Sequence, residues 1–131
     1  MPNWAIEFHD STFDGVEVEG TDLVLRFSAA YLHQSEGKPG VDAGSDWVQE
    51  VRLHISDASL SGEILDLPCD LWDGSISLDN ERFDNCVPIP LDHRGRVEVS
   101  LEQDGKLTII GTRLRVELLG QAKYVEEFPG Q

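Results

Sequence analysis

The feature that most constrains this chain is an alternation of apolar and polar residues with a period of two. Val97, Val99 and Leu101, for example, alternate with charged and hydroxyl side chains. The same alternation recurs in segments 16–19, 23–28, 50–56, 75–78 and 114–118. Because successive side chains of a β-strand point to opposite faces, the pattern predicts strands with one buried face and one face in water. No long stripe with a period of 3.6 residues is present, so we expect an all-β protein.

Turn signals divide these strands into hairpins. Gly20-Thr21 predicts a tight turn, and Asp104-Gly105 predicts a two-residue type I′ turn. Gly111-Thr112 predicts a further turn, which would make the last third of the chain a three-stranded meander with a short edge strand at 124–128. Segment 36–46 is typical of a flexible loop, and the one candidate for a short helix is segment 28–34.

These segments predict a single domain over residues 1–131. Many short antiparallel strands with at most one short helix indicate either an antiparallel β-sandwich or a partly closed barrel. We prefer the sandwich, because the sequence gives no sign of barrel closure.

The charge of the chain excludes some classes of partner. Lys and Arg number 10 and Asp and Glu number 25, which gives a formal net charge of −15. Such a charge repels nucleic acid and anionic lipid and attracts basic proteins.

No apolar run approaches the ~20 residues that span a bilayer, and the first residues lack the pattern of a signal peptide, so we expect a cytoplasmic protein. In that compartment Cys69 and Cys86 are expected to be unbridged thiols.

No motif assigns chemistry to this chain, so we expect no catalytic residue, no cofactor and no metal. In His9-Asp10-Ser11 the adjacent side chains point to opposite faces of a strand, which favours a structural role with His9 bound to a backbone carbonyl. His54 and His93 lack metal-binding spacing, and His33 lies near the flexible loop. A metal-dependent enzyme in which His9, His54 and His93 converge stays an alternative.

The acidic stretch 57–84 is the candidate binding surface. Its carboxylates match no calcium-binding loop, which favours solvated loops over a metal site. If the charge serves recognition, the densest set is Asp70, Asp73, Asp79 and Asp84. A second alternative is a pocket for a small ligand lined by Trp4, Trp47 and Trp72, although packing explains these residues equally well.

Both ends of the chain resemble known sequences. The segment Phe8-His9-Asp10-Ser11-Thr12-Phe13, followed by a strand, resembles the opening of small uncharacterised bacterial β-proteins, and the segment 116–128 resembles their ends. Some of those proteins resemble immunity proteins of bacterial toxin systems, which bind and block a cognate toxin. The resemblance implies a non-enzymatic inhibitor of a basic partner, and it brings no catalytic residues with it.

Overall fold

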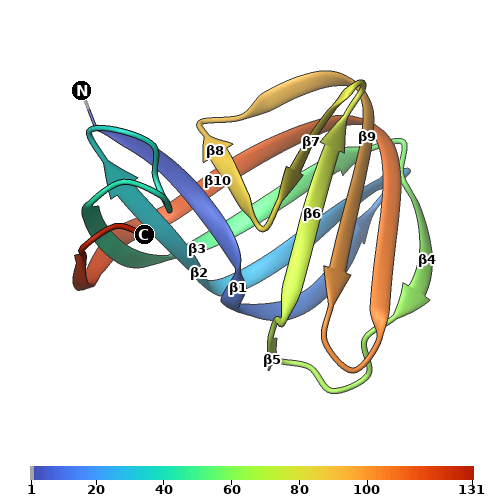
Figure 1. Ribbon diagram of the computed structural model, residues 1–131. Helices are drawn as coiled ribbons and strands as arrows, with labels where there is room; N and C mark the ends of the chain where they lie inside the picture. The colour runs from blue at the N-terminus through green and yellow to red at the C-terminus, as the bar shows by residue number, and fades with distance from the viewer. Residues whose placement is uncertain (1) are drawn as a thin grey trace.

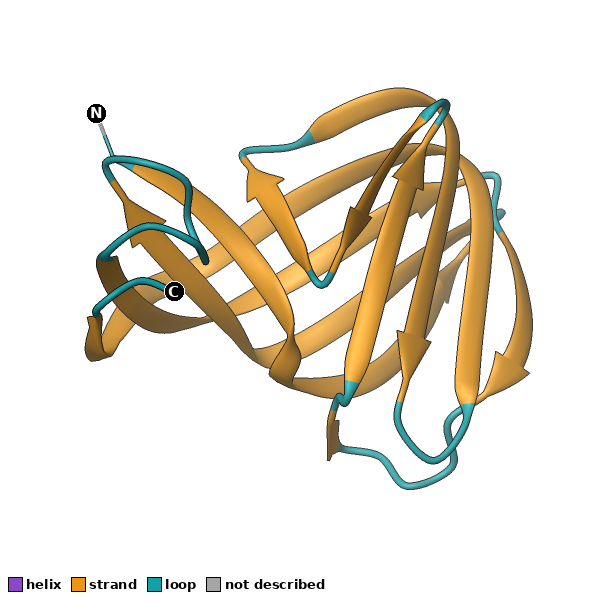
Figure 2. Ribbon diagram, in the orientation of Figure 1, coloured by secondary structure: helices purple, strands orange, loops and turns teal. Residues whose placement is uncertain are grey.

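The protein is a single antiparallel β-sheet that curls into a half-barrel (Figure 1). The computed structural model describes residues 2–131, and this part of the chain contains strands and loops without any helix (Figure 2). The all-β prediction is therefore confirmed. The one continuous curled sheet is consistent with the predicted alternatives, a β-sandwich or a partly closed barrel. Within residues 2–131 no helix has the length and apolar character needed to cross a membrane.

Ten strands make up this sheet. Their bounds are β1 (Asn3–Glu19), β2 (Asp22–Ser35), β3 (Gly44–Ser56), β4 (Ser59–Glu63), β5 (Cys69–Asp70), β6 (Asp73–Leu78), β7 (Glu81–Asp84), β8 (Cys86–Ile89), β9 (Asp92–Glu102) and β10 (Lys106–Phe128). They pair in the order β5-β1-β2-β3-β10-β9-β6-β7, with β8 paired to β1 and β4 paired to β10. Strand β10 is central, because its second half pairs with β3 and its first half with β4 and β9.

The predicted C-terminal meander is wrong. Segments 107–110 and 114–118 belong to one continuous strand, β10, and Gly111 lies within it. An added Cβ at Gly111 would lie 2.5 Å from Ile55 Cγ2 and 2.6 Å from the Ser56 carbonyl oxygen. This glycine therefore permits close packing and makes no turn. The predicted strand at 124–128 is the end of the same strand. It pairs with β3 on one side, and among residues 2–131 no strand pairs with its other side, so its edge position is as predicted.

Two further local predictions need correction. Segment 28–34, the candidate for a short helix, lies within β2 and pairs with β1 and β3. The Asp104-Gly105 hairpin is in the expected place, but its loop has three residues, 103–105, and neither Asp104 nor Gly105 has a positive φ, which a type I′ turn requires. The Gly20-Thr21 hairpin is confirmed, with Gly20 at a φ of 65°.

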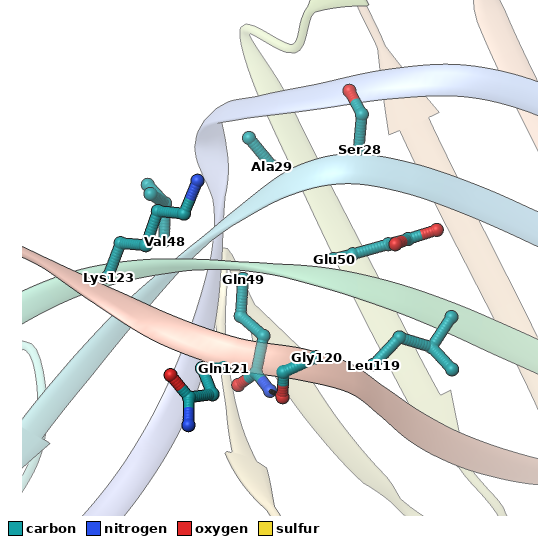
Figure 3. Close-up of a pocket in the computed structure, with 9 residues that line it drawn as sticks. All are labelled: Ser28, Ala29, Val48, Gln49, Glu50, Leu119, Gly120, Gln121 and Lys123. Carbon is teal, nitrogen blue, oxygen red and sulfur yellow. Dashed lines mark hydrogen bonds between the residues drawn. The ribbon is translucent and has the colours of Figure 1, made fainter.

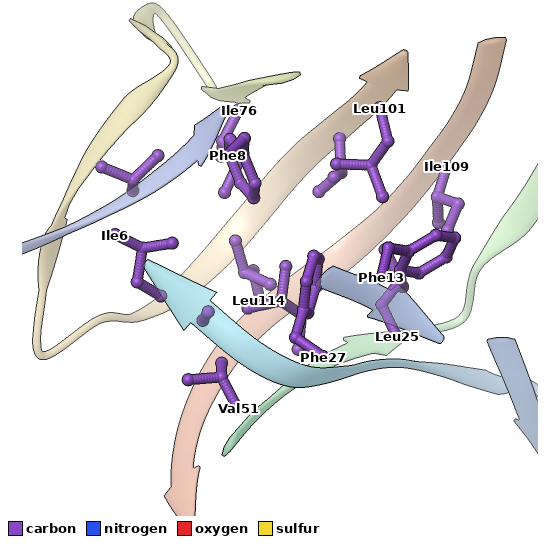
Figure 4. Packing of buried hydrophobic residues seen from close by; sticks show 14 of the residues in the cluster. Ile6, Phe8, Phe13, Leu25, Phe27, Val51, Ile76, Leu101, Ile109 and Leu114 are labelled. Atoms are coloured by element: carbon purple, nitrogen blue, oxygen red, sulfur yellow. The ribbon is translucent and has the colours of Figure 1, made fainter. Parts of the chain in front are cut away.

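The core fills the concave side of the sheet. Figure 4 shows Phe8, Phe13 and Phe27 at its centre, and the ring centroid of Phe27 lies 6.3 Å from that of Phe8 and 5.3 Å from that of Phe13. All three side chains are buried, with branched residues from β3, β6, β9 and β10 packed around them. Along each strand, the apolar residues of the alternating pattern therefore point into the core, and the polar residues between them point to the convex side.

Candidate functional site

One region of the convex side carries many carboxylates. Neighbouring positions on β6, β7, β9 and β10 form a shallow depression of about 200 Å³, which we call the acidic hollow. Its side chains are Asp73, Ser75, Arg82, Asp84, Glu98, Ser100, Glu102, Lys106 and Thr108. Arg82 contacts Asp84 at 2.8 Å and Lys106 contacts Glu102 at 3.7 Å. Within residues 2–131 no cationic side chain lies at salt-bridge distance from Asp73 or Glu98.

The four aspartates predicted to bind a partner do not form one cluster. Asp73 and Asp84 both line the acidic hollow. Asp70 lies on β5, where it accepts a hydrogen bond from Thr12. Asp79 follows the other end of β6 and accepts hydrogen bonds from His93 Nε2 and the backbone N–H of Arg96. Only half of the predicted set therefore shares one surface.

The three histidines of the enzyme alternative are each held by a different partner. The Nδ1 atom of His9 lies 2.8 Å from the Trp72 carbonyl oxygen, which confirms the structural role expected for this residue. His54 Nε2 lies 2.7 Å from Glu117 on β10, and His93 Nε2 lies 2.7 Å from Asp79. His54 and His93 lie opposite adjacent residues of β10, Arg115 and Leu114, which point to opposite faces of the sheet. Within residues 2–131 neither these two histidines nor His9 belongs to a group of three metal-ligating side chains.

The fourth histidine, His33, lies in a second buried cluster on the side of the sheet opposite to the core. It comes from β2, directly opposite Ala5 of β1 and Asp46 of β3. Two residues further along β1, Glu7 lies opposite Cys86 of β8. A left-handed Asp10, with a φ of 70°, interrupts the β1–β2 register beyond Glu7, and the Ser11 hydroxyl donates a hydrogen bond to the Glu7 carbonyl.

The loop over residues 36–43 and the end of the chain cover this cluster. Gly40 packs so closely that a Cβ there would lie 3.1 Å from Cys86 Sγ and 3.6 Å from His33 Cδ2. The ring centroid of Phe128 lies 5.1 Å from that of His33. Ser35 Oγ donates to the carbonyl of Ala43, and the Val41 carbonyl accepts from the N–H of Gln131. As a result, His33 and Asp46 are only 4% and 3% exposed.

The polar atoms of His33 lie close to carboxylates without forming aligned hydrogen bonds. His33 Nδ1 is 2.6 Å from Asp46 Oδ1, and Nε2 is 3.4 Å from Glu7 Oε2. Both ring nitrogens thus have a carboxylate as an ion-pair partner, but neither nitrogen, nor Asp46 Oδ1, takes part in a hydrogen bond of good geometry. The other oxygen of Asp46 accepts a hydrogen bond from the Tyr31 hydroxyl at 2.9 Å. Buried polar atoms without a hydrogen bond are rare in proteins and call for an explanation.

These surroundings change the pKa values of the cluster. Burial lowers the pKa of His33, but the carboxylates of Glu7 and Asp46 outweigh it, and the pKa rises above its ordinary value of 6.5. For Tyr31, burial and the Asp46 carboxylate raise the pKa of the phenol. Burial and the charge of Glu7 raise the pKa of the Cys86 thiol to about 11, so without a further ligand this thiol is protonated at neutral pH.

We expect His33 to titrate above pH 6.5 in chelator-treated protein. Its contribution to the free energy of unfolding is then fully present below pH 6.5 and is lost as the pH rises through the higher pKa of the folded state. The measurement is an NMR titration of the His33 ring. Glu7→Gln removes one of the two carboxylates and should lower the His33 pKa. A His33 pKa below 6.5 in the unsubstituted protein would contradict this prediction.

Other depressions lie elsewhere on the surface of residues 2–131, and three of them bear on the ligand hypotheses. One, of about 420 Å³, adjoins the His33 cluster, because Cys86 lines it together with Lys38, Gly40 and Asn85. A second, of about 330 Å³, lies at the register shifts of β2 and β10 (Figure 3). Figure 3 shows the charged ends of Glu50 and Lys123 pointing in different directions, so they do not converge on one ligand.

The third depression bears on the small-ligand alternative. It is about 290 Å³ and largely apolar, with Trp4, Leu32, Ile89 and Leu118 among its lining residues. Trp4 packs on Trp47 with ring centroids 5.9 Å apart, whereas Trp72 lies elsewhere and is 58% exposed. Ligand pockets usually measure about 300–1,000 Å³. The three tryptophans therefore do not form the common pocket that this alternative requires.

The chain matches no protein-family model, no curated protein and no solved structure. The site residues are therefore assigned from geometry alone. Both cysteines are free thiols, as expected. The cluster of Glu7, His33 and Cys86 was not predicted from the sequence, because the three residues lie far apart along the chain and meet only through strand pairing. The signal that could have found it is a histidine on a strand face whose neighbours in the sheet carry acidic side chains.

Proposed function

We propose that this protein is a non-enzymatic binding domain that holds a basic protein partner at the acidic hollow. The observation that carries the proposal is the charge of one open sheet face: four carboxylates against two cations, in a chain with a net charge of −15. Asp73 and Glu98 have no cationic partner within the described part of the chain, so their charges are available to lysine or arginine side chains of another protein.

The neutral groups of the hollow favour the same kind of partner. Ser75, Ser100 and Thr108 lie side by side on β6, β9 and β10, because Ser75 is opposite Ser100 and Ser100 is opposite Thr108. Hydroxyl oxygens accept hydrogen bonds, and a guanidinium group has five N–H donors that need acceptors. A row of hydroxyls flanked by carboxylates therefore suits arginine better than an acidic or apolar ligand.

The chain ends resemble those of small bacterial β-proteins, some of which resemble immunity proteins, and this supports a more specific proposal. An immunity-type inhibitor binds and blocks its toxin, so the basic partner would be a toxin. Complementary charge mainly accelerates association, and its effect decreases as salt screens the charges. This mode of binding needs no catalytic residue, no cofactor and no nucleic acid or membrane.

We expect a labelled octa-arginine peptide to bind the acidic hollow, and we expect its affinity to fall as salt is raised. The double variant Asp73→Asn/Glu98→Gln should weaken binding by about two- to thirtyfold at low ionic strength, because each lost charge pair contributes about 0.2–1 kcal/mol. The measurements are fluorescence anisotropy across a salt series and NMR shift mapping. The amides of Ser75, Ser100 and Thr108 should shift most.

The matched control is Glu19→Gln/Glu50→Gln, which removes the same charge from two exposed positions outside the hollow. It should leave the affinity nearly unchanged. Equal losses for the two double variants, or shifts spread over all acidic loops, would mean that the acidity serves solubility alone, and the proposed function would then be wrong.

A further inference from the structure

The ligand atoms of three different residues converge in the buried cluster. Glu7 offers a carboxylate oxygen from β1, His33 a ring nitrogen from β2 and Cys86 a sulfur from β8, and all these atoms lie within 4.8 Å of one another. The pairing of Glu7 with Cys86 and of Ala5 with His33 fixes this arrangement through the sheet itself. It is the one such group of three in residues 2–131.

The second observation is the state of His33. This side chain is 4% exposed, yet both of its ring nitrogens lack a hydrogen bond. Buried polar atoms are nearly always hydrogen-bonded, and this ring has only ion-pair contacts, at 2.6 Å to Asp46 and 3.4 Å to Glu7, so Nε2 lacks a well-aligned interaction. A metal ion bound to Nε2 would provide that interaction and would at the same time neutralise part of the negative charge of Glu7 and Asp46.

We propose that Glu7, His33 and Cys86 bind a divalent transition-metal ion, with zinc as the best match. Thiolate, imidazole and carboxylate are the three ligand types that zinc takes from proteins. Zinc bonds of about 2.0–2.3 Å in a tetrahedral arrangement hold ligand atoms roughly 3.3–3.8 Å apart. The 3.4 Å between His33 Nε2 and Glu7 Oε2 already has this separation, and Cys86 Sγ lies within 4.8 Å of the ligand atoms of the other two residues.

The residues around the cluster have the arrangement expected of a metal centre. Ligating histidines usually direct their second nitrogen to a carboxylate, which fixes the orientation of the ring. Asp46 occupies that position beside His33 Nδ1, and Tyr31 in turn donates to Asp46. With three protein ligands a fourth position stays open, and Cys86 borders the depression of about 420 Å³ from which water or a small ligand could reach it.

Chelator-treated protein should bind one Co²⁺ ion with an absorption band from thiolate-to-cobalt charge transfer, and Zn²⁺ should displace the Co²⁺. The titration is run with millimolar Mg²⁺, which occupies the exposed carboxylates without competing for a thiolate. Cys86→Ala should abolish the band. The matched control is Cys69→Ala, which removes the other free thiol of the chain and should leave the band unchanged.

Two further measurements separate ligand loss from unfolding. Zn²⁺ should shift the ring signals of His33 in the unsubstituted protein and leave those of His54 and His93 in place. Asp46→Asn should weaken Zn²⁺ binding by about 10–100-fold, as expected for a residue that orients a ligand. Absence of the charge-transfer band in the unsubstituted protein, or its loss in Cys69→Ala, would overturn the proposal. Because the cluster and the acidic hollow share no residue, failure of one proposal leaves the other standing.

Discussion

Phe27→Ala is expected to lower the free energy of unfolding by about 3–5 kcal/mol, the usual effect of removing a fully buried phenylalanine. Phe27 is 2% exposed and packs between Phe8 and Phe13, so its loss leaves a cavity where segments of β1 and β2 meet. Domains of this size are stable by about 5–15 kcal/mol, so the variant should be close to unfolding. Urea denaturation followed by circular dichroism gives the value.

The matched control for Phe27 is Trp72→Ala. Trp72 is also aromatic, but it is 58% exposed, so its removal should change the stability by about 0.5 kcal/mol or less. Phe27→Leu should lie between the two, because leucine refills part of the space. A loss for Phe27→Ala as small as that for Trp72→Ala would show that the three phenylalanines are not the centre of the core.

Asp46→Ala is expected to have the second large effect, a loss of about 3 kcal/mol in metal-free protein. Removing one member of a buried charged pair leaves the other without compensation, which typically costs about 3–5 kcal/mol. Here the substitution leaves protonated His33 with Glu7 alone and removes the acceptor of the Tyr31 hydroxyl. Thermal and urea unfolding at pH 6, with chelator present, measure this loss.

An exposed ion pair provides the comparison for Asp46. Asp92 forms a two-bond contact with Arg113, with N–O distances of 2.9 and 2.7 Å, and this contact lowers the pKa of Asp92. Because solvent screens this pair, Asp92→Ala should lower the stability only slightly. Equal losses of stability for Asp92→Ala and Asp46→Ala would contradict this prediction, because they would show that burial of the ion pair does not increase the cost of removing its carboxylate.

The sequence predicts the strands of this fold better than it predicts their connections. Alternation identified the segments around Val51, Val97 and Val99, because it reports directly which side chains face the core. It failed at Gly111, where the residue type that marks turns also permits close packing against Ile55. A glycine is compatible with both roles, and the choice depends on a strand more than fifty residues away in sequence.

The candidate sites were predictable only in part, for a related reason. Asp73 and Asp84 were recognised from the acidity of their segment, whereas Glu98 and Glu102 join them through the pairing of β6 with β9. Glu7, His33 and Cys86 have no local motif, since the three residues meet only when β1, β2 and β8 pair. Sites built across strands follow from sheet register, and register is the property that alternation alone leaves undetermined.

The central position of β10 has a consequence for how this protein is made. Strands β1, β2 and β3 are complete after residue 56, but β3 gains its second neighbour only when residues 113–128 have been synthesised. At about 5–20 residues per second, the backbone groups along one edge of β3 stay unpaired for several seconds or longer on the ribosome. Unpaired strand edges are templates for aggregation. A nascent chain of this protein is therefore one that a chaperone would need to shield until its last strand has been inserted.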